Sequence, residues 1–128
     1  MKPVMQTRYG DAGNCLTACI ASLLELPIEA VPDFIEHDAG HGEYLEVFNG
    51  FLSQFGLQAL TLFLEHLDVQ WKPSGYHLIY GYTAEGTKHA VVGFQGTVVH
   101  NPSLAGASLA NIESYTVFVC NLTESLRT

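Results

Sequence analysis

Two side chains far apart in the sequence could together make a nucleophile, the thiol of Cys15 and the imidazole of His89. Cysteine attacks as its thiolate, and a histidine beside it can take the thiol proton near neutral pH. Cys15 begins a stretch with helical periodicity, whereas His89 lies near the start of a stretch typical of a strand. Such a pair would support nucleophilic attack on an acyl carbon.

The helix predicted at Cys15 favours the thiolate, but only weakly. Asn14 is the expected N-cap, apolar residues recur through Leu24, and Pro27 is expected to end the helix. The unpaired N–H groups and the positive end of the helix dipole stabilise a thiolate by roughly 0.3–1 kcal/mol. One pKa unit corresponds to about 1.4 kcal/mol, so His89 is needed to lower the pKa of Cys15 further.

The residue that orients His89 depends on the hairpin that follows it. If Gln95-Gly96 is a two-residue loop, Phe94 pairs with residue 97 and His100 shares the face of His89. In a three-residue loop with a glycine bulge, residue 94 pairs with residue 98 and Asn101 shares that face. Gln-Gly is a poor type I′ pair, which favours the three-residue loop and Asn101.

The remaining periodicity indicates two layers. A helix over 43–55 carries an apolar stripe from Tyr44 to Phe55, and Gly56 stands where a helix is often terminated. Period-2 patterns then predict strands over 57–64, 76–82, 88–94, 97–101 and 112–122. Helices followed by a run of antiparallel strands predict an α+β fold with the N-terminal helices packed on one face of the sheet.

Length and composition limit the classes of function. The 128 residues are expected to form one domain, 1–128, with a core of its own. A net charge of −8 with five Lys and Arg argues against a nucleic-acid partner. No secretory signal is visible over 1–14, and the apolar run 15–28 is too short to cross a bilayer. These features, with three cysteines, predict a cytoplasmic protein with no membrane partner.

The other cysteines and histidines have plainer interpretations. Cys19 and Cys120 are expected to be core residues. His37 and His41 could join Cys15 and Cys19 at a zinc ion, but glycines make their segment a loop and tight Cys knuckles are missing. We therefore expect neither a metal nor a cofactor. The histidines expected to be ordinary strand or loop residues are His66 and His77.

The order of these short motifs resembles that of a known superfamily. Gln6 ahead of Gly-Asn-Cys15, then His89-Ala-Val-Val, then His-Asn101-Pro, is similar to the papain-like cysteine peptidases. The closest similarity is to the domains of bacteriocin exporters that cleave leader peptides, and to small single-domain bacterial and phage proteins. That branch usually has Asp where this chain has Asn101, and papain itself has Asn.

The resemblance implies a papain-like fold and a role for each matched residue. Cys15 would be the nucleophile, His89 the general base and acid, and Asn101 the residue that orients the imidazole. Gln6 and the backbone N–H of Cys15 would form the oxyanion hole. The expected reaction is hydrolysis of a peptide, isopeptide or amide bond in a peptide or protein substrate. The alternative is a catalytically silent binding or inhibitory module with the same fold. The oligomeric state stays open.

Overall fold

The computed structural model describes residues 1–9, 13–37, 44–104, 106 and 108–120. In chain order the helices and strands are α1 (Cys15–Leu24), η2 (Ile28–Ala30), η3 (Phe34–His37), α2 (Tyr44–Ser53), β1 (Leu57–Phe63), η4 (Leu64–His66), β2 (Tyr76–Tyr82), β3 (Lys88–Phe94), β4 (Thr97–His100) and β5 (Asn111–Cys120). The two α-helices and five strands fall where their periodicity predicts them. Glu43 and the expected loop residues 38–42 lie outside the described part of the chain.

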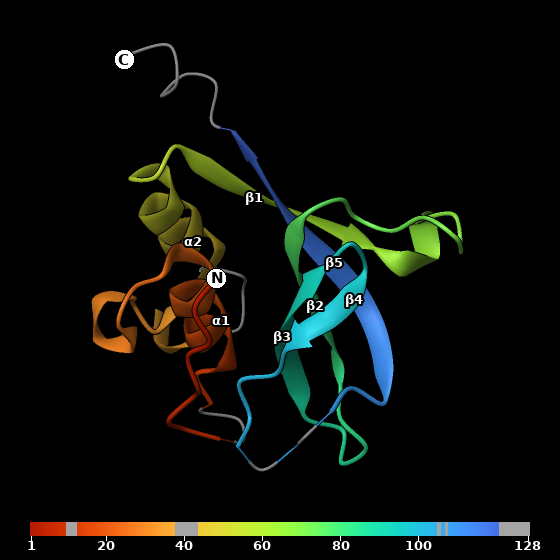
Figure 1. The fold of residues 1–128 in the computed structure, drawn as a ribbon, viewed down its shortest axis with the longest axis horizontal. Coiled ribbons are helices and arrows are strands. Elements are labelled where there is room, and N and C mark those ends of the chain that lie inside the picture. Colours follow the sequence, from red (N-terminus) through yellow and green to blue (C-terminus); the bar gives the residue numbers. More distant parts are fainter. Residues whose placement is uncertain (10–12, 38–43, 105, 107, 121–128) are drawn as a thin grey trace.

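The five strands form one antiparallel sheet in the order β1-β5-β2-β3-β4. Both α-helices pack on the same face of this sheet, α1 against β3 and α2 against β1 (Figure 1). The α+β prediction is therefore confirmed. No helix in the described ranges has the length and apolar character needed to cross a bilayer.

The main core lies between the helices and the sheet. Its buried apolar side chains come from α1, η3, α2, β2 and β3, and include Ile20, Phe34, Phe48, Leu78 and Val92. Burying side chains of this size contributes about 1.5–3 kcal/mol each. This packing fixes α1, and with it Cys15, against β3.

Two of the predicted helix ends differ from the structure. Helix α1 ends at Leu24, two residues before the expected end, because Glu25 takes a left-handed conformation with φ 57°. Helix α2 ends at Ser53, and Gly56 has φ +71° in the turn that follows. Phe55 therefore leaves the helical stripe and is 43% exposed rather than buried.

The hairpin after His89 has a two-residue loop, so the predicted three-residue loop is wrong. Gln95 and Gly96 have φ values of 53° and 83°, and Phe94 pairs with Thr97. A bulge further along β4 then shifts the register, so that Val92 pairs with His100.

Beyond this bulge the register equals that of the three-residue loop. Gly93 pairs with Val98 before the bulge, and Val99 is the additional residue on β4. Asn101 consequently lies on the face of His89, as expected, although the extra residue is in the strand and not in the turn.

Cys120 is exposed, which contradicts its expected place in the core. The last residues of β5 extend beyond β2, since the β2–β5 register runs only as far as Leu78 with Thr116. Cys120 pairs with Leu57 of β1 alone. It therefore lies in the last part of β5, which is paired with β1 but not with β2.

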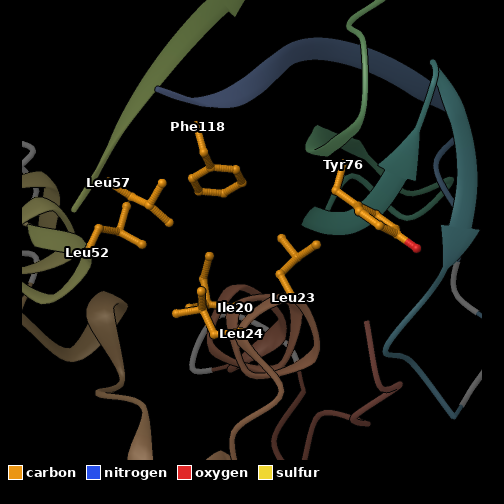
Figure 2. Close-up of a pocket in the computed structure, with 7 residues that line it drawn as sticks. All are labelled: Ile20, Leu23, Leu24, Leu52, Leu57, Tyr76 and Phe118. Atoms are coloured by element: carbon orange, nitrogen blue, oxygen red, sulfur yellow. The ribbon is translucent and has the colours of Figure 1, made fainter. Parts of the chain in front are cut away.

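A cavity of about 200 Å³ lies between the two helices and the sheet (Figure 2). The side chains around it are apolar except for the hydroxyl of Tyr76, and they are Ile20, Leu23, Leu24, Leu52, Leu57, Tyr76 and Phe118. Among the described residues this lining offers neither a nucleophile nor a base that could perform the predicted chemistry.

The opposite face of the sheet carries a smaller core around Ile79, Val91 and Tyr115. His77, predicted to be an ordinary strand or loop residue, lies in β2 on this face. Its side chain is fully buried. Its Nδ1 donates to the Gly75 carbonyl over 2.9 Å. Its Nε2 is buried and has no hydrogen-bond partner among the described residues. Burial lowers the pKa of His77, because a charged ring would lose its hydration.

We expect His77 to make the fold sensitive to acid. In the unfolded chain His77 takes up a proton near pH 6.5, whereas in the folded protein its pKa is lower. The contribution of His77 to the free energy of unfolding is therefore complete above about pH 6.5. It decreases as the pH falls below that value, by at most about 1.4 kcal/mol per pH unit. Urea denaturation at pH 7.5 and pH 5 measures this loss. In His77→Gln the loss should be smaller, because glutamine does not titrate. An equal loss in both proteins would contradict the prediction.

Candidate active site

Cys15 is the first residue of α1, and its side chain is half-buried against β3. The backbone N–H groups of Ala90, Leu16 and Cys15 itself lie close enough to its sulfur to lower the pKa of the thiol. Ala90 directly follows His89, so the packing of α1 on β3 places the sulfur within one residue of the predicted base.

Burial raises the pKa of the Cys15 thiol, and the three backbone N–H groups only partly oppose this effect. The sequence predicts the opposite direction for this pKa. The helix terminus does act as expected, but removing the sulfur from water has the larger effect. A thiolate is therefore less stable here than on an exposed cysteine.

His89 is 5% exposed, and a hydrogen bond fixes its ring. Its Nε2 lies 2.8 Å from Oδ1 of Asn101. The same Oδ1 accepts the backbone N–H of Ser103 over 3.1 Å, which identifies it as the amide oxygen. Nε2 must then carry the proton, and in the neutral ring Nδ1 keeps its lone pair. The ring is held in the tautomer in which Nδ1 can accept a proton.

His100, the other candidate to orient His89, has a different partner. Its Nε2 lies 2.8 Å from the carbonyl oxygen of Val4, in the N-terminal segment. The segment also contacts this region through the backbone N–H of Gln6, which donates to the Pro102 carbonyl over 2.9 Å. His100 therefore helps to hold residues 4–6 beside the end of β4.

Gln6 is buried, but it is not among the described residues that line the cavity shared by Cys15 and His89. Its Nε2 donates to the Arg8 carbonyl over 2.9 Å, and its Oε1 is buried without a hydrogen-bond partner in the described part of the chain. Gln6, the predicted oxyanion donor, thus lies outside the described lining of the cavity, and one of its amide N–H groups is already hydrogen-bonded to Arg8.

Cys15 and His89 line one cavity of about 250 Å³, which also has aromatic, apolar and charged walls. The described lining residues are Gly13, Cys15, Leu16, Ile35, Tyr44, Tyr80, Lys88, His89 and Ala90. The sequence pattern predicts the pairing of Cys15 with His89, but not the neighbouring side chains Tyr44, Tyr80 and Lys88. Lys88 adjoins His89 in the chain, and Tyr80 pairs with Ala90 across the β2–β3 ladder. Strand pairing could therefore have pointed to Tyr80.

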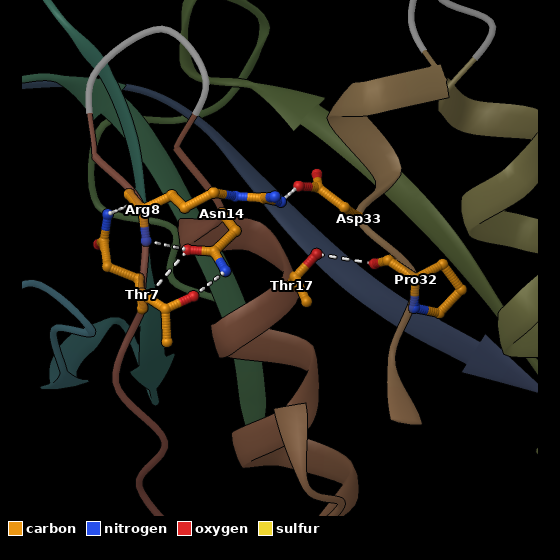
Figure 3. A network of polar contacts seen from close by, with 7 residues as sticks. Thr7, Arg8, Asn14, Thr17, Pro32 and Asp33 are labelled. Atoms are coloured by element: carbon orange, nitrogen blue, oxygen red, sulfur yellow. Dashed lines mark hydrogen bonds and ion pairs between the residues drawn. The ribbon is translucent and has the colours of Figure 1, made fainter. Parts of the chain in front are cut away.

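Asn14 is at the N-cap position, but its side chain does not cap the helix. Its Oδ1 accepts the backbone N–H groups of Thr7 and Arg8, each over 2.9 Å, and its Nδ2 donates to Oγ1 of Thr7 over 2.8 Å (Figure 3). Asn14 thus connects the N-terminal segment to the start of α1.

Two further contacts connect this network to the segment before η3. The Arg8 guanidinium pairs with the Asp33 carboxylate, and Oγ1 of Thr17 donates to the Pro32 carbonyl over 2.7 Å (Figure 3). Three stretches of chain, around residues 7, 15 and 32, are therefore fixed to one another at the N-terminal end of α1.

Cys19 lies one turn along α1 and is fully buried, as predicted. Its thiol contacts the Ala90 carbonyl at 3.5 Å. Burial raises the pKa of Cys19 well above its ordinary value, and a charge on Cys15 would raise it further. Among the described residues, no three His, Cys, Asp or Glu side chains form a group that could hold a metal ion. His41, considered for a zinc site, lies outside the described residues.

Comparison with known proteins finds no match to this chain among family models, curated proteins or solved structures. The interpretation of the site therefore rests on its own residues and their geometry.

We expect Asn14→Ala to destabilise the protein by about 1–3 kcal/mol, because two backbone N–H groups would lose their buried acceptor. Urea denaturation of both proteins measures the difference. Asn14→Asp is the matched control: it keeps the acceptor oxygen, and the Thr7 hydroxyl can donate to it. An alanine variant as stable as the wild-type protein would contradict the assigned role.

Proposed function

We propose that the protein is a papain-like cysteine hydrolase that cleaves a peptide, isopeptide or amide bond by acyl transfer to water. The observation that carries this proposal is the shared cavity: Cys15 and His89 both line it, and Asn101 holds His89 in a tautomer that can accept a proton. The motif order in the sequence supports the same conclusion.

In the proposed first step, Nδ1 of His89 takes the Cys15 proton while the sulfur bonds to the substrate carbonyl carbon. The carbonyl oxygen becomes negatively charged in the tetrahedral intermediate. When the carbon–nitrogen bond breaks, the imidazolium returns its proton to the departing amine, which leaves a thioester. Water then attacks the thioester with His89 again as base, which releases the carboxylic acid and restores the thiol.

The burial of Cys15 makes the base essential in this mechanism. Because burial raises the pKa of Cys15, losing a proton to bulk water would leave an isolated charge in a poorly hydrated place. Passing the proton to His89 keeps the pair neutral overall. The reaction therefore depends on His89 more strongly than it would at an exposed cysteine.

The charged oxygen of the intermediate needs hydrogen-bond donors. The backbone N–H of Cys15, at the N-terminus of α1, is one proposed donor. The Gln6 amide stays the predicted second donor, a contact typically worth about 3–4 kcal/mol.

A second candidate function is a binding or inhibitory module that keeps the fold without catalysis. The raised pKa of Cys15 and the Gln6 N–H bonded to Arg8 favour it, because both differ from what efficient acyl transfer requires. Loss of biological activity in Cys15→Ala, with an unchanged melting temperature, would count against this alternative.

For the hydrolase we propose a peptide or protein substrate and no nucleic-acid partner. The net charge of −8 opposes binding to phosphates. The three free cysteines fit a reducing compartment, and we propose the cytoplasm.

Alkylation of Cys15 by iodoacetamide tests the proton transfer. In the wild-type protein we expect labelling of Cys15 to persist at pH 7, because His89 accepts the proton. In His89→Ala the thiol keeps its burial-raised pKa, so the midpoint of its pH–rate profile should lie at higher pH than in the wild-type protein. Peptide mass spectrometry measures the labelling of Cys15, with exposed Cys120 as the reference thiol in the same sample.

His66→Ala is the matched control, since His66 is an exposed histidine in η4 and does not line the cavity. Its Cys15 profile should superimpose on that of the wild-type protein. If the His89→Ala profile also superimposes on it, His89 is not the base and the hydrolase proposal fails.

A further inference from the structure

A basic side chain, Lys88, is among the described residues that line the cavity at Cys15. The described lining of this cavity includes no aspartate or glutamate, whereas the chain as a whole has 13 acidic and 5 basic residues. A lysine beside a reactive cysteine in an acidic protein provides a local site for a negative group.

Lys88 is held loosely. Its Nζ lies 6.0 Å from the centre of the Tyr80 ring and 3.8 Å from Oε1 of Glu113. The Lys88 side chain is 56% exposed and that of Glu113 is 31% exposed. Ion pairs this accessible to water contribute little to stability, so the ammonium can change partners at small cost.

Glu113 has another partner if Lys88 turns away. The charge of the Glu113 carboxylate, together with its hydrogen bond to the phenol, raises the pKa of Tyr82. The carboxylate therefore still has the Tyr82 hydroxyl as a donor when Lys88 binds something else. Lys88 and Tyr82 are paired residues on β3 and β2. Glu113 can therefore keep its contact with Tyr82 while the Lys88 side chain alone changes its conformation.

We propose that Lys88 binds a carboxylate on the acyl part of the substrate, the part that becomes attached to Cys15. This inference rests on the proposed hydrolase function and adds the substrate class. The apolar walls at Leu16, Ile35 and Tyr44 would hold the remainder of the acyl group. An ammonium at the end of a flexible chain suits a single carboxylate.

Iodoacetate and iodoacetamide test this inference, because they alkylate by the same reaction and differ in one negative charge. Their rate constants are measured at Cys15 and at exposed Cys120 at pH 8 and low salt. The iodoacetate-to-iodoacetamide ratio at Cys15, divided by that at Cys120, removes the repulsion due to the net charge of the protein. Lys88→Met should lower this normalised ratio about fivefold, which corresponds to losing an attraction of about 1 kcal/mol, that of two unit charges about 4 Å apart at the dielectric constant of water.

Three further variants and a change of salt concentration sharpen the result. Lys88→Arg should keep most of the ratio, and Glu113→Gln should raise it by freeing the ammonium. Lys72→Met, with the same change of charge, should leave it unaltered, since Lys72 lies beside Trp71 and Tyr115, away from the Cys15 cavity. The effect of Lys88→Met should also vanish in 1 M NaCl, where the screening length is about 3 Å.

Equal normalised ratios in Lys88→Met and Lys72→Met would overturn the inference about the substrate. The hydrolase proposal is judged separately, on whether iodoacetamide labelling of Cys15 depends on His89. A His89-dependent reaction with no effect of Lys88 on the ratio removes the carboxylate site alone. A fivefold loss specific to Lys88 supports it.

Discussion

The packing of the N-terminus of α1 on β3 is the constraint on which the rest of the site depends. It brings the sulfur of Cys15 to the backbone N–H of Ala90, next to His89. The same packing removes the sulfur from water and raises its pKa. The proximity of Cys15 to His89 and the loss of hydration at the sulfur therefore have one cause. Such a site disfavours a free thiolate, because the charged sulfur would lose its hydration.

The placement of Asn101 shows how strand register selects the hydrogen-bond partner of His89. A two-residue loop alone would have brought His100 to the face of His89. The bulge in β4 adds Val99 and reverses this, so that Asn101 bonds to the imidazole and His100 bonds to Val4 instead. One additional residue in a short edge strand thus selects the tautomer of the ring.

Residues 6–8 form a network of contacts with Asn14 and Asp33 at the N-terminal end of α1. Asn14 binds Thr7 and Arg8, and Arg8 pairs with Asp33 (Figure 3). Gln6 joins this network because its Nε2 donates to the Arg8 carbonyl. Because these contacts join stretches that are distant in sequence, the shape of the site is set by several weak interactions acting together.

The sequence by itself determined the α+β class, the helix that begins at Cys15 and the strand that carries His89. Each of these depends on local periodicity, which reports the face that a helix or strand buries. Only the tertiary structure decided the β4 bulge, the partners of Asn14, the exposure of Cys120 and the place of Lys88 in the cavity. These depend on register and on contacts between distant segments, where a shift of one residue exchanges one face of a strand for the other.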